Sequence, residues 1–444
     1  MIIIILFAAF LLGVPIAFAL GLVSLGQIVA DGYPLLVVAQ RLFTGVDSIA
    51  LTAIPLFILS GGLMLKGGMS DRLVNFADLL IGHHPSGLAM VSILACMFFA
   101  AITGSAIAAT AAIGGIMAPI MIEKGYDKEF CAPLLATGGS IGPIIPPSIP
   151  LLIYGVMANV SVAKLFIGGF IPGILMGVAL MIYSYFVGKK RNYIGRDEKA
   201  SFKEVLVAGK DAILALIMPI IIIGGIMSGF FSPTESATVA TFYALIIGLF
   251  VYKELKISDL PGILLDAAKS TGQVLLVVGA ASLFTWVITV NNIPQTVGAF
   301  LADNIGSKFM LLLIINIILL IAGTFIDTTS AVVIFTPLFL PIVQTFGIDV
   351  IHFGLVMAVN LTIGMCTPPL GVCLFVAGSI TKVSLKEQMK DLVPMLVVLL
   401  VVLLIITYIP SMVTILPNLF VKWYFKLLTI CKLDVGRDYT NINS

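Results

Sequence analysis

Charged residues are scarce in this chain. Asp, Glu, Lys and Arg make up 10% of its 444 residues, whereas 60% are hydrophobic and the mean hydropathy is +1.17. Soluble globular domains carry about 25% charged residues, so the composition excludes an ordinary soluble fold. Residues 1–30 hold no charge, and the first basic residue is Arg41. The segment lacks the basic start of a cleaved signal peptide, and we expect a retained first membrane span.

Motifs of enzymes are also lacking. The sequence has no Gly-x-x-x-x-Gly-Lys-Ser/Thr phosphate-binding loop and thus no sign of its own ATPase. It has no Ser-His-Asp or His-Glu-x-x-His arrangement that would support an intramembrane hydrolase. The net charge of +2 is too small to indicate nucleic-acid binding. We expect no enzyme activity, no cofactor and no nucleic-acid partner.

Metal ligands are equally sparse. His83 and His84 are adjacent and have no third ligand near in sequence, which favours a solvated pair over a metal site. The cysteines show no CxxC spacing, so free packing thiols are expected rather than disulfides. These cysteines are Cys96, Cys131, Cys366, Cys373 and Cys431.

Long apolar segments recur along the chain and indicate an all-α polytopic membrane protein. Each is near or above the ~20 residues that a membrane-spanning helix needs. The predicted spans are 1–30, 49–66, 128–158, 162–187, 211–230, 234–252, 272–290, 350–381 and 390–410. Two amphipathic segments, 71–80 and 257–270, are expected to lie along the membrane surface.

Two further apolar segments are interrupted by small and polar residues. Segment 86–122 is broken at residues 103–105, and segment 309–346 is broken at residues 323–330. A limb of about 17 residues is only ~25 Å long as a helix. Each segment is therefore predicted to form a re-entrant helical hairpin with its tip near mid-membrane.

The two halves of the chain repeat each other at a shift of 222 residues. Doubled prolines inside apolar segments release carbonyls and amides that need protein, ion or substrate partners. Paired breaks of this kind are the best sequence indicator of a transporter's binding site. The matching positions are Pro119 with Pro341, Asp127 with Asp349, Ile141-Gly142 with Ile363-Gly364, Pro146-Pro147 with Pro368-Pro369, and Pro172 with Pro394.

Charges between the spans predict the topology. Residues 189–203 form one dense basic loop, which the positive-inside rule places in the cytoplasm. From this anchor the first hairpin opens toward the cytoplasm and the second opens outward, as an inverted repeat requires. The same count puts the amino terminus inside and the region after residue 410 outside.

Hydroxyls and glycines gather at the hairpin tips and at the breaks. Hydroxyl oxygens and unwound backbone carbonyls suit a sodium ion, while the amino ends of half-helices suit an anionic group. The candidates at the tips are Thr103, Gly104, Ser105, Gly323, Asp327 and Thr328. Those at the breaks are Ser140, Gly142, Thr362, Gly364 and Thr367.

Three of the polar candidates have alternative roles. Asp327 is the one carboxylate in the apolar body of either hairpin, and it could hold a cation or cap the second limb. Asn360 could contact substrate or form an interhelical hydrogen bond. Glu235 follows a proline and is expected to cap a helix.

These motifs resemble those of the large membrane subunit of a tripartite ATP-independent periplasmic (TRAP) transporter, a family that takes up organic acids. The resemblance extends over nearly residues 1–420. It is carried by Gly104-Ser105 and the alanine-rich limb after it, Gly125-Tyr126-Asp127, the run GGSIGPIIPPSIP at 138–150, and Asn360 through Pro369.

The resemblance implies an inverted-repeat elevator fold with two re-entrant hairpins and two broken helices. A mobile domain of this fold carries substrate and sodium together past a scaffold. The implied sodium ligands are Ser105, Ser140, Gly142, Gly323, Asp327, Thr362 and Thr367. Substrate is expected between the tips, near Pro147 and Asn360, with Ser105 and Thr328 as further candidates.

The expected division of the chain follows the same family pattern. Residues 86–158 and 309–381 would form the transport domain. The scaffold would comprise 1–85, 159–308 and 382–427, followed by a polar tail at 428–444 that has no family role.

The resemblance also implies partners and a location. These are a separate small four-helix membrane subunit, a periplasmic substrate-binding protein, and the inner membrane of a bacterium. The expected function is sodium-coupled import of an organic acid, a C4-dicarboxylate by default or a sialic or other sugar acid. A stand-alone sodium/dicarboxylate symporter and a passive anion channel are the alternatives.

Overall fold

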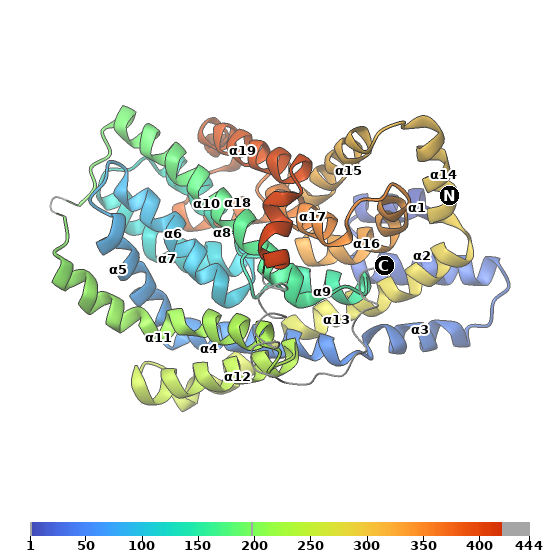
Figure 1. Ribbon diagram of the computed structural model, residues 1–444, viewed down its shortest axis with the longest axis horizontal. Helices are drawn as coiled ribbons and strands as arrows, with labels where there is room; N and C mark the ends of the chain where they lie inside the picture. Colours follow the sequence, from blue (N-terminus) through green and yellow to red (C-terminus); the bar gives the residue numbers. More distant parts are fainter. Residues whose placement is uncertain (1, 197–198, 420–444) are drawn as a thin grey trace.

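Helices account for almost all of the secondary structure in the computed structural model, which describes residues 2–196 and 199–419 (Figure 1). No β-strand occurs in these residues. Eight helical segments within them are long and apolar enough to cross a membrane. The prediction of a polytopic helical membrane protein is therefore confirmed. The predicted tail at 428–444 and Cys431 lie outside the described residues.

Two helical hairpins and two broken helices form the centre of the molecule. The hairpins are α6 (Gly87–Thr103) with α7 (Ala106–Glu123), and α15 (Lys308–Gly323) with α16 (Thr328–Thr345). The broken helices are α8 (Lys128–Gly139) with α9 (Ile149–Met157), and α17 (Val350–Gly364) with α18 (Val372–Thr381). In Figure 1 the first hairpin lies to the left of the centre and the second to the right, so their tips approach from opposite ends.

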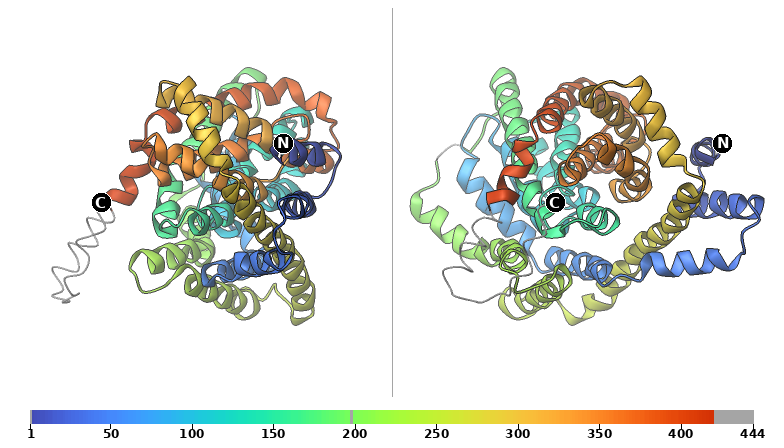
Figure 2. Two further views of the ribbon diagram at one scale, coloured as in Figure 1. Left: turned by 90° about the vertical axis from the view of Figure 1, so that its right-hand side faces the viewer. Right: turned by 45° about the vertical axis from the view of Figure 1, so that its right-hand side comes forward.

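A second layer of helices lies along one side of this central body, at the lower edge of Figure 1 and in both views of Figure 2. Within the layer α13 packs against α2, α3 and α4, and α4 packs against α12. The layer reaches the hairpins where α4 contacts α6 and α13 contacts α16. Its helices are α2 (Ile16–Ala30), α3 (Leu36–Val46), α4 (Ala53–Lys66), α12 (Pro233–Ile246) and α13 (Leu260–Val290).

The remaining helices connect or flank these two groups. Helix α5 packs against α6 and α11, whereas α14 packs against α16. Their bounds are α1 (Ile2–Leu11), α5 (Met69–Ile81), α10 (Val162–Arg191), α11 (Phe202–Met227), α14 (Ile293–Asn304) and α19 (Leu385–Tyr408). Three short segments complete the list, namely η1 (Ile49–Thr52), the π-helical turn η2 (Ile247–Val251) and η3 (Ile257–Asp259).

The internal repeat is visible in the helix bounds. Shifting α7 by 222 residues reproduces both bounds of α16. Both halves carry a cis peptide bond at the predicted break, at Pro146-Pro147 and at Pro368-Pro369. The chain is therefore interrupted at the same place in each half.

The expectation of a single span over residues 1–30 is wrong. The chain forms two helices there, α1 and α2, which pack against each other. Gly13 between them has a φ of +78°, which favours glycine, and Pro15 precedes the first turn of α2. The prediction that the amino terminus lies inside depends on a single crossing over residues 1–30. With two helices in this segment, that prediction no longer follows.

The separate surface helix predicted at 257–270 is also wrong. After the short turn η3, the chain enters α13 at Leu260 and continues as one helix to Val290. Charged residues in its first turns do not end it, because helical hydrogen bonding continues through them into the apolar span. Helices α3 and α14 were not predicted at all.

The packing of α10 and α19 differs from the expected division of the chain. Both were assigned to the scaffold by position, yet α10 packs against α6, α9 and α17. Helix α19 packs against α8, α10 and α17. Both helices thus lie directly against the hairpins or broken helices. The division of the chain into a mobile transport domain and a fixed scaffold stays a prediction.

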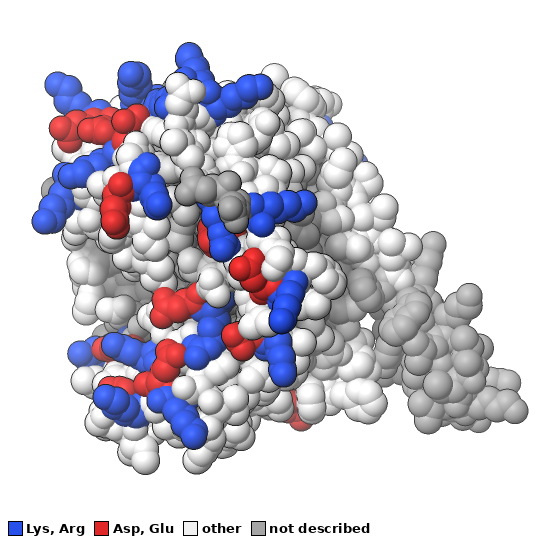
Figure 3. All heavy atoms as spheres, turned by 90° about the vertical axis from the view of Figure 1, so that its left-hand side faces the viewer, with Lys and Arg blue, Asp and Glu red and all other residues white. Residues whose placement is uncertain are grey.

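Charged side chains gather at one end of the molecule, the left-hand end of Figure 1, which Figure 3 shows face-on. Helix α10 brings Lys189, Lys190 and Arg191 there in its last turn. Arg72 of α5 contributes an ion pair with Glu254 at 2.7 Å. By the positive-inside rule, this end is expected to face the cytoplasm.

Candidate functional site

Each hairpin tip is held by a side chain that caps the second limb. The Ser105 hydroxyl accepts a hydrogen bond from the Ala108 amide at 3.3 Å. The Asp327 carboxylate accepts one from the Ser330 amide at 3.1 Å. The capping role considered for Asp327 is thus present. The amino end of α7, capped by a neutral hydroxyl, favours an anionic group between the tips, whereas the amino end of α16 already carries the Asp327 carboxylate.

Each helix break is pressed against the hairpin tip of its own half. A Cβ built on Gly142 would lie 2.7 Å from the Ser105 carbonyl oxygen, and a Cβ on Gly364 would lie 2.6 Å from the Cα of Gly323. Gly104 has a φ of +61°, and a Cβ there would meet the carbonyl oxygen of Pro147. Only glycine permits backbone contacts this close.

Hydroxyl groups flank the breaks at matching positions. Ser140 donates to the Thr137 carbonyl at 2.7 Å, and Thr362 donates to the Val359 carbonyl at 2.8 Å. Thr367 likewise donates to the Ile363 carbonyl at 2.9 Å. A hydroxyl that donates its proton to its own helix keeps oxygen lone pairs available to a cation.

The predicted sodium candidates therefore gather in two clusters, one in each half. In the first, Ser105 contacts Gly142, and in the second, Gly323 contacts Gly364. Ser140 and Thr362 stand two residues before Gly142 and Gly364 and are buried. The oxygen ligands available are hydroxyl and peptide oxygens, together with the Asp327 carboxylate on the second tip, and they fit a sodium ion. No group of three or more His, Cys, Asp or Glu residues that could hold a metal ion occurs in the described part of the chain.

A cavity of about 620 Å³ lies between the hairpin tips and the second layer. The central body contributes Thr103, Gly104, Ser105, Pro143, residues 327–330 and Met365. The layer contributes residues of α4, including Lys66, and a row of residues along α13. The volume falls within the ~300–1,000 Å³ of small-molecule sites.

Two of the predicted substrate residues do not line this cavity, although Pro147 contacts Gly104, which does. Pro147 and Asn360 are not among the described residues that line it. Asn360 is fully buried, and its side-chain amide donates to the backbone carbonyl and to the side-chain oxygen of Asn316, at 2.9 and 2.8 Å. The structure thus shows the interhelical hydrogen bond that was the alternative role of Asn360. Ser105 and Thr328, in contrast, do line the cavity.

The other polar candidates are placed as follows. Glu235 caps α12 in a reciprocal arrangement with Ser232, as expected. The rings of His83 and His84 lie against each other, tilted by 36° with centroids 4.1 Å apart. Four cysteines are buried and free, namely Cys96, Cys131, Cys366 and Cys373.

The sequence reasoning missed the cavity wall on α13. Asp266, Ser270 and Gln273 line the cavity from this helix. Their spacing of four and three residues puts them on one helical face, which was the signal available in the sequence. The expected boundary at residue 270 separates Asp266 and Ser270 from Gln273, whereas the structure has all three on one continuous helix.

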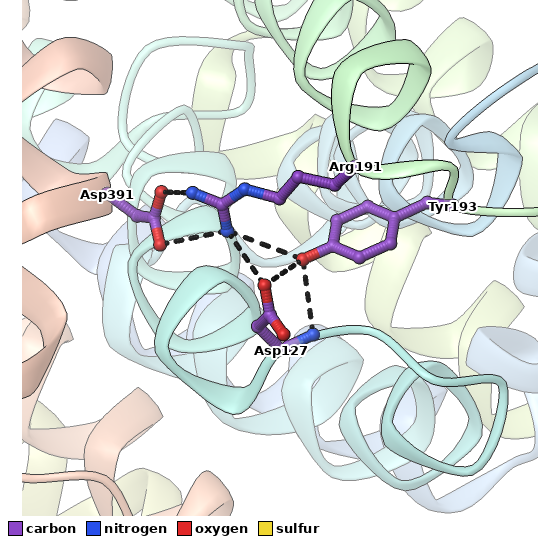
Figure 4. Close-up of polar contacts among 4 residues, drawn as sticks. All are labelled: Asp127, Arg191, Tyr193 and Asp391. Carbon is purple, nitrogen blue, oxygen red and sulfur yellow. Dashed lines mark hydrogen bonds and ion pairs between the residues drawn. The ribbon is translucent and has the colours of Figure 1, made fainter.

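An ion-pair cluster joins α10, α19 and the start of α8 (Figure 4). The Arg191 guanidinium pairs with both oxygens of Asp391, whose side chain is 6% exposed, and contacts Asp127 at 3.0 Å. Tyr193 donates to the same Asp127 carboxylate at 2.6 Å. Burial, together with this hydrogen bond, raises the pKa of Tyr193 to about 12, so the phenol remains a donor at neutral pH.

Two hairpins, two broken helices and one shared cavity in a polytopic helical bundle define a membrane transport protein. The chain belongs to the tripartite ATP-independent periplasmic transporter family, DctM component, whose family model matches residues 3–412. The relatives below are named as transport permeases, which agrees with the expectation of a transporter rather than an enzyme.

The chain is 45% identical over 408 residues to the isethionate TRAP transporter permease protein DctMQ of Oleidesulfovibrio alaskensis. The match covers 91% of this chain but only 64% of that relative's length. The chain is 40% identical to the C4-dicarboxylate TRAP transporter large permease protein DctM of Pseudomonas aeruginosa, with 86% and 89% of the two chains covered. It is 37% identical to the sialic acid TRAP transporter large permease protein SiaM of Vibrio cholerae, with 92% and 96% covered.

A solved structure shares the fold. The crystal structure of the YdaH transporter of Alcanivorax borkumensis, described as having an unusual topology, superposes with a TM-score of 0.57. The match covers 83% of this chain and 86% of that chain, at 12% sequence identity. At this identity the likeness shows a common fold alone.

Proposed function

We propose that this chain is the permease subunit that imports an organic acid together with sodium ions. The observation that carries the proposal is the pair of repeat-related tip and break clusters beside one cavity. Sodium ions held by hydroxyl and peptide oxygens would add positive charge next to the amino ends of α7 and α16. Among the described residues that line the cavity there is no arginine to pair with an acid. The sodium ions and the helix ends would supply the positive charge that the acid needs.

The proposed movement is of the elevator type. One wall of the cavity belongs to the hairpins, and the other belongs to α4 and α13. A displacement of the central body along the second layer would carry the tips, the sodium ions and the acid together. Small residues support such sliding, since Gly61 of α4 lets Thr103 approach so closely that a Cβ on Gly61 would lie 3.3 Å from the Thr103 methyl carbon.

The partners proposed are a small four-helix membrane subunit and a periplasmic protein that delivers the acid, in the inner membrane of a bacterium. The names of the relatives support an acidic substrate, because they cover isethionate, C4-dicarboxylates and sialic acid. The C4-dicarboxylate and sugar-acid predictions both remain candidates.

The test is uptake by proteoliposomes that contain the full chain with the small subunit, supplied with the periplasmic protein. Isethionate, succinate and N-acetylneuraminate serve as probes, with liposomes lacking the chain as the control. We expect at least one probe to accumulate against its gradient when sodium is supplied outside and not when potassium replaces it. Accumulation without the periplasmic protein would indicate a stand-alone symporter. Equilibration that ignores sodium would indicate an anion channel and overturn the proposal.

A further inference from the structure

A polar row on α13 faces the hairpin tips across the cavity. Asp266, Ser270 and Gln273 line the cavity from successive turns of this helix. Val274 and Val277 continue the same face with apolar side chains. Ile263 and Ala267 add apolar contacts on either side of Asp266, so the polar groups of this wall are confined to Asp266, Ser270 and Gln273.

Gln273 is the unusual member of this row. It stands one residue inside the start of the apolar span predicted at 272–290, but it lines the same cavity as the hairpin tips, and its side chain is exposed rather than packed. A polar side chain at this depth is costly unless it faces protein partners or a water-filled space. Because Gln273 lines the cavity, the amide retains contact with whatever fills it. By default, such a residue marks a substrate pathway.

The two walls differ in charge. The tip wall offers the amino ends of α7 and α16 together with the Asp327 carboxylate, and the proposed sodium ions would offset that carboxylate and leave a place for an anionic group. The layer offers one cation, Lys66, and one anion, Asp266, so it carries no net positive charge that would hold a second carboxylate. The neutral amide and hydroxyl of Gln273 and Ser270 instead match a hydrogen-bonding group without charge.

We propose that Gln273, with Ser270, recognises a hydroxyl group at the end of the substrate remote from its acid group. This inference rests on the proposed function and deepens it, because it makes the substrate a hydroxylated organic acid. The acid group lies toward the tips and the hydroxyl lies toward α13. A site built to bond a hydroxyl discriminates against an analogue without it, because its polar groups are then left unpaired.

Matched acids that differ by one hydroxyl provide the test. The pairs are isethionate with ethanesulfonate and malate with succinate, and N-acetylneuraminate extends the panel as a hydroxylated acid without a mate. Binding is measured as the sodium-dependent thermal stabilisation of the purified full chain with its small subunit. The variants are Gln273→Leu and Ser270→Ala. Gln40→Leu, on the exposed face of α3 and outside the cavity, is the control.

We expect the wild type to bind the hydroxylated member of at least one pair about fivefold or more tightly than its mate. Gln273→Leu should remove this preference and leave both the affinity for the mate and the sodium dependence unchanged. If N-acetylneuraminate is the only probe that binds, Gln273→Leu should lower the affinity for it about fivefold or more. Gln40→Leu should behave as wild type, and Ser270→Ala should show a smaller loss.

Two results would overturn the inference. The first is a wild type that shows no preference for the hydroxylated acid. The second is a Gln273→Leu variant that keeps the preference or binds N-acetylneuraminate with the affinity of the wild type. Sodium-dependent binding in the same samples would leave the proposed function intact. If no acid stabilised the wild type in sodium, the proposed function would fail as well.

Discussion

Ser105 and Asp327 occupy the same position in the two halves of the chain and cap the same limb of the two hairpins. The residues are 222 positions apart, each accepts a hydrogen bond from the amide three residues later, and both line one cavity. They differ in charge, because a neutral hydroxyl in the first half is matched by a carboxylate in the second. The two tips are therefore alike in geometry and unlike in electrostatics.

Replacing Ser105 by alanine should weaken the response to sodium. The variant loses a candidate ligand oxygen, and we expect the sodium concentration for half-maximal uptake to rise about fivefold. Ser307→Ala is the matched control, since Ser307 caps α15 through the Met310 amide at 3.2 Å and does not line the cavity. Both changes should cost about 1 kcal/mol of stability as lost caps, but only Ser105→Ala should alter the sodium response. An unchanged sodium curve would remove Ser105 from the site.

Replacing Asp327 by asparagine separates the charge from the cap. Asparagine caps helices about as well as aspartate, so stability should change little. We expect a loss of about tenfold in sodium affinity, because a negative charge beside the ion is removed. Asp349→Asn is the control, since Asp349 caps α17 through the His352 amide at 2.7 Å away from the cavity. Equal sodium curves for the two variants would assign Asp327 to capping alone.

A methyl group at Gly364 should disrupt the second break. The added Cβ would lie 2.6 Å from Gly323, so either the tip or the break must shift. We expect Gly364→Ala to abolish sodium-coupled uptake in proteoliposomes and to lower the unfolding temperature. Gly115→Ala on α7 is the control, because a Cβ there meets nothing within 4 Å and should leave stability equal or slightly higher. Normal uptake by Gly364→Ala would show that this close approach is not required.

The Arg191–Asp391 pair should hold α10 and α19 together. Arg191→Met leaves a nearly buried carboxylate unpaired, and we expect it to cost about 2 kcal/mol of unfolding free energy, because Arg191 is 27% exposed. Adding Asp391→Leu should recover part of that loss, as a double-mutant cycle in a denaturant titration can show. Arg196→Met is the control, since its 3.9 Å contact with Asp78 is exposed and should be worth under ~1 kcal/mol. Additive losses at Arg191 and Asp391 would mean that the pair is not coupled.

The repeat and both breaks could be predicted from sequence because proline and glycine restrict the backbone locally. Pro146-Pro147 and Pro368-Pro369 stand inside apolar segments, and no continuous helix accommodates them. The two hairpins could be predicted as well, because each limb is too short to cross the membrane as a helix. The break within residues 1–30 was not predicted, because apolar length alone does not separate one span from two short helices. The local indicator of the break is Gly13, followed by Pro15.

The partners of buried polar groups could not be predicted in this way. Asn360 bonds to Asn316, which lies 44 residues earlier on another helix, and no local pattern reports such a contact. The cavity wall on α13 likewise depends on how two layers of helices meet. Residue type identified the tips as candidate sites, but only the tertiary packing shows that Asn360 faces α15 and Gln273 faces the cavity.

The most direct measurement is a cryo-EM map of the protein with its small subunit, recorded in sodium with a bound acid. We expect ion density at two positions related by the repeat, one beside the contact of Ser105 with Gly142 and one beside the contact of Gly323 with Gly364. The acid should lie between the tips and α13. Density for the acid without an ion at either position would contradict sodium coupling through these clusters.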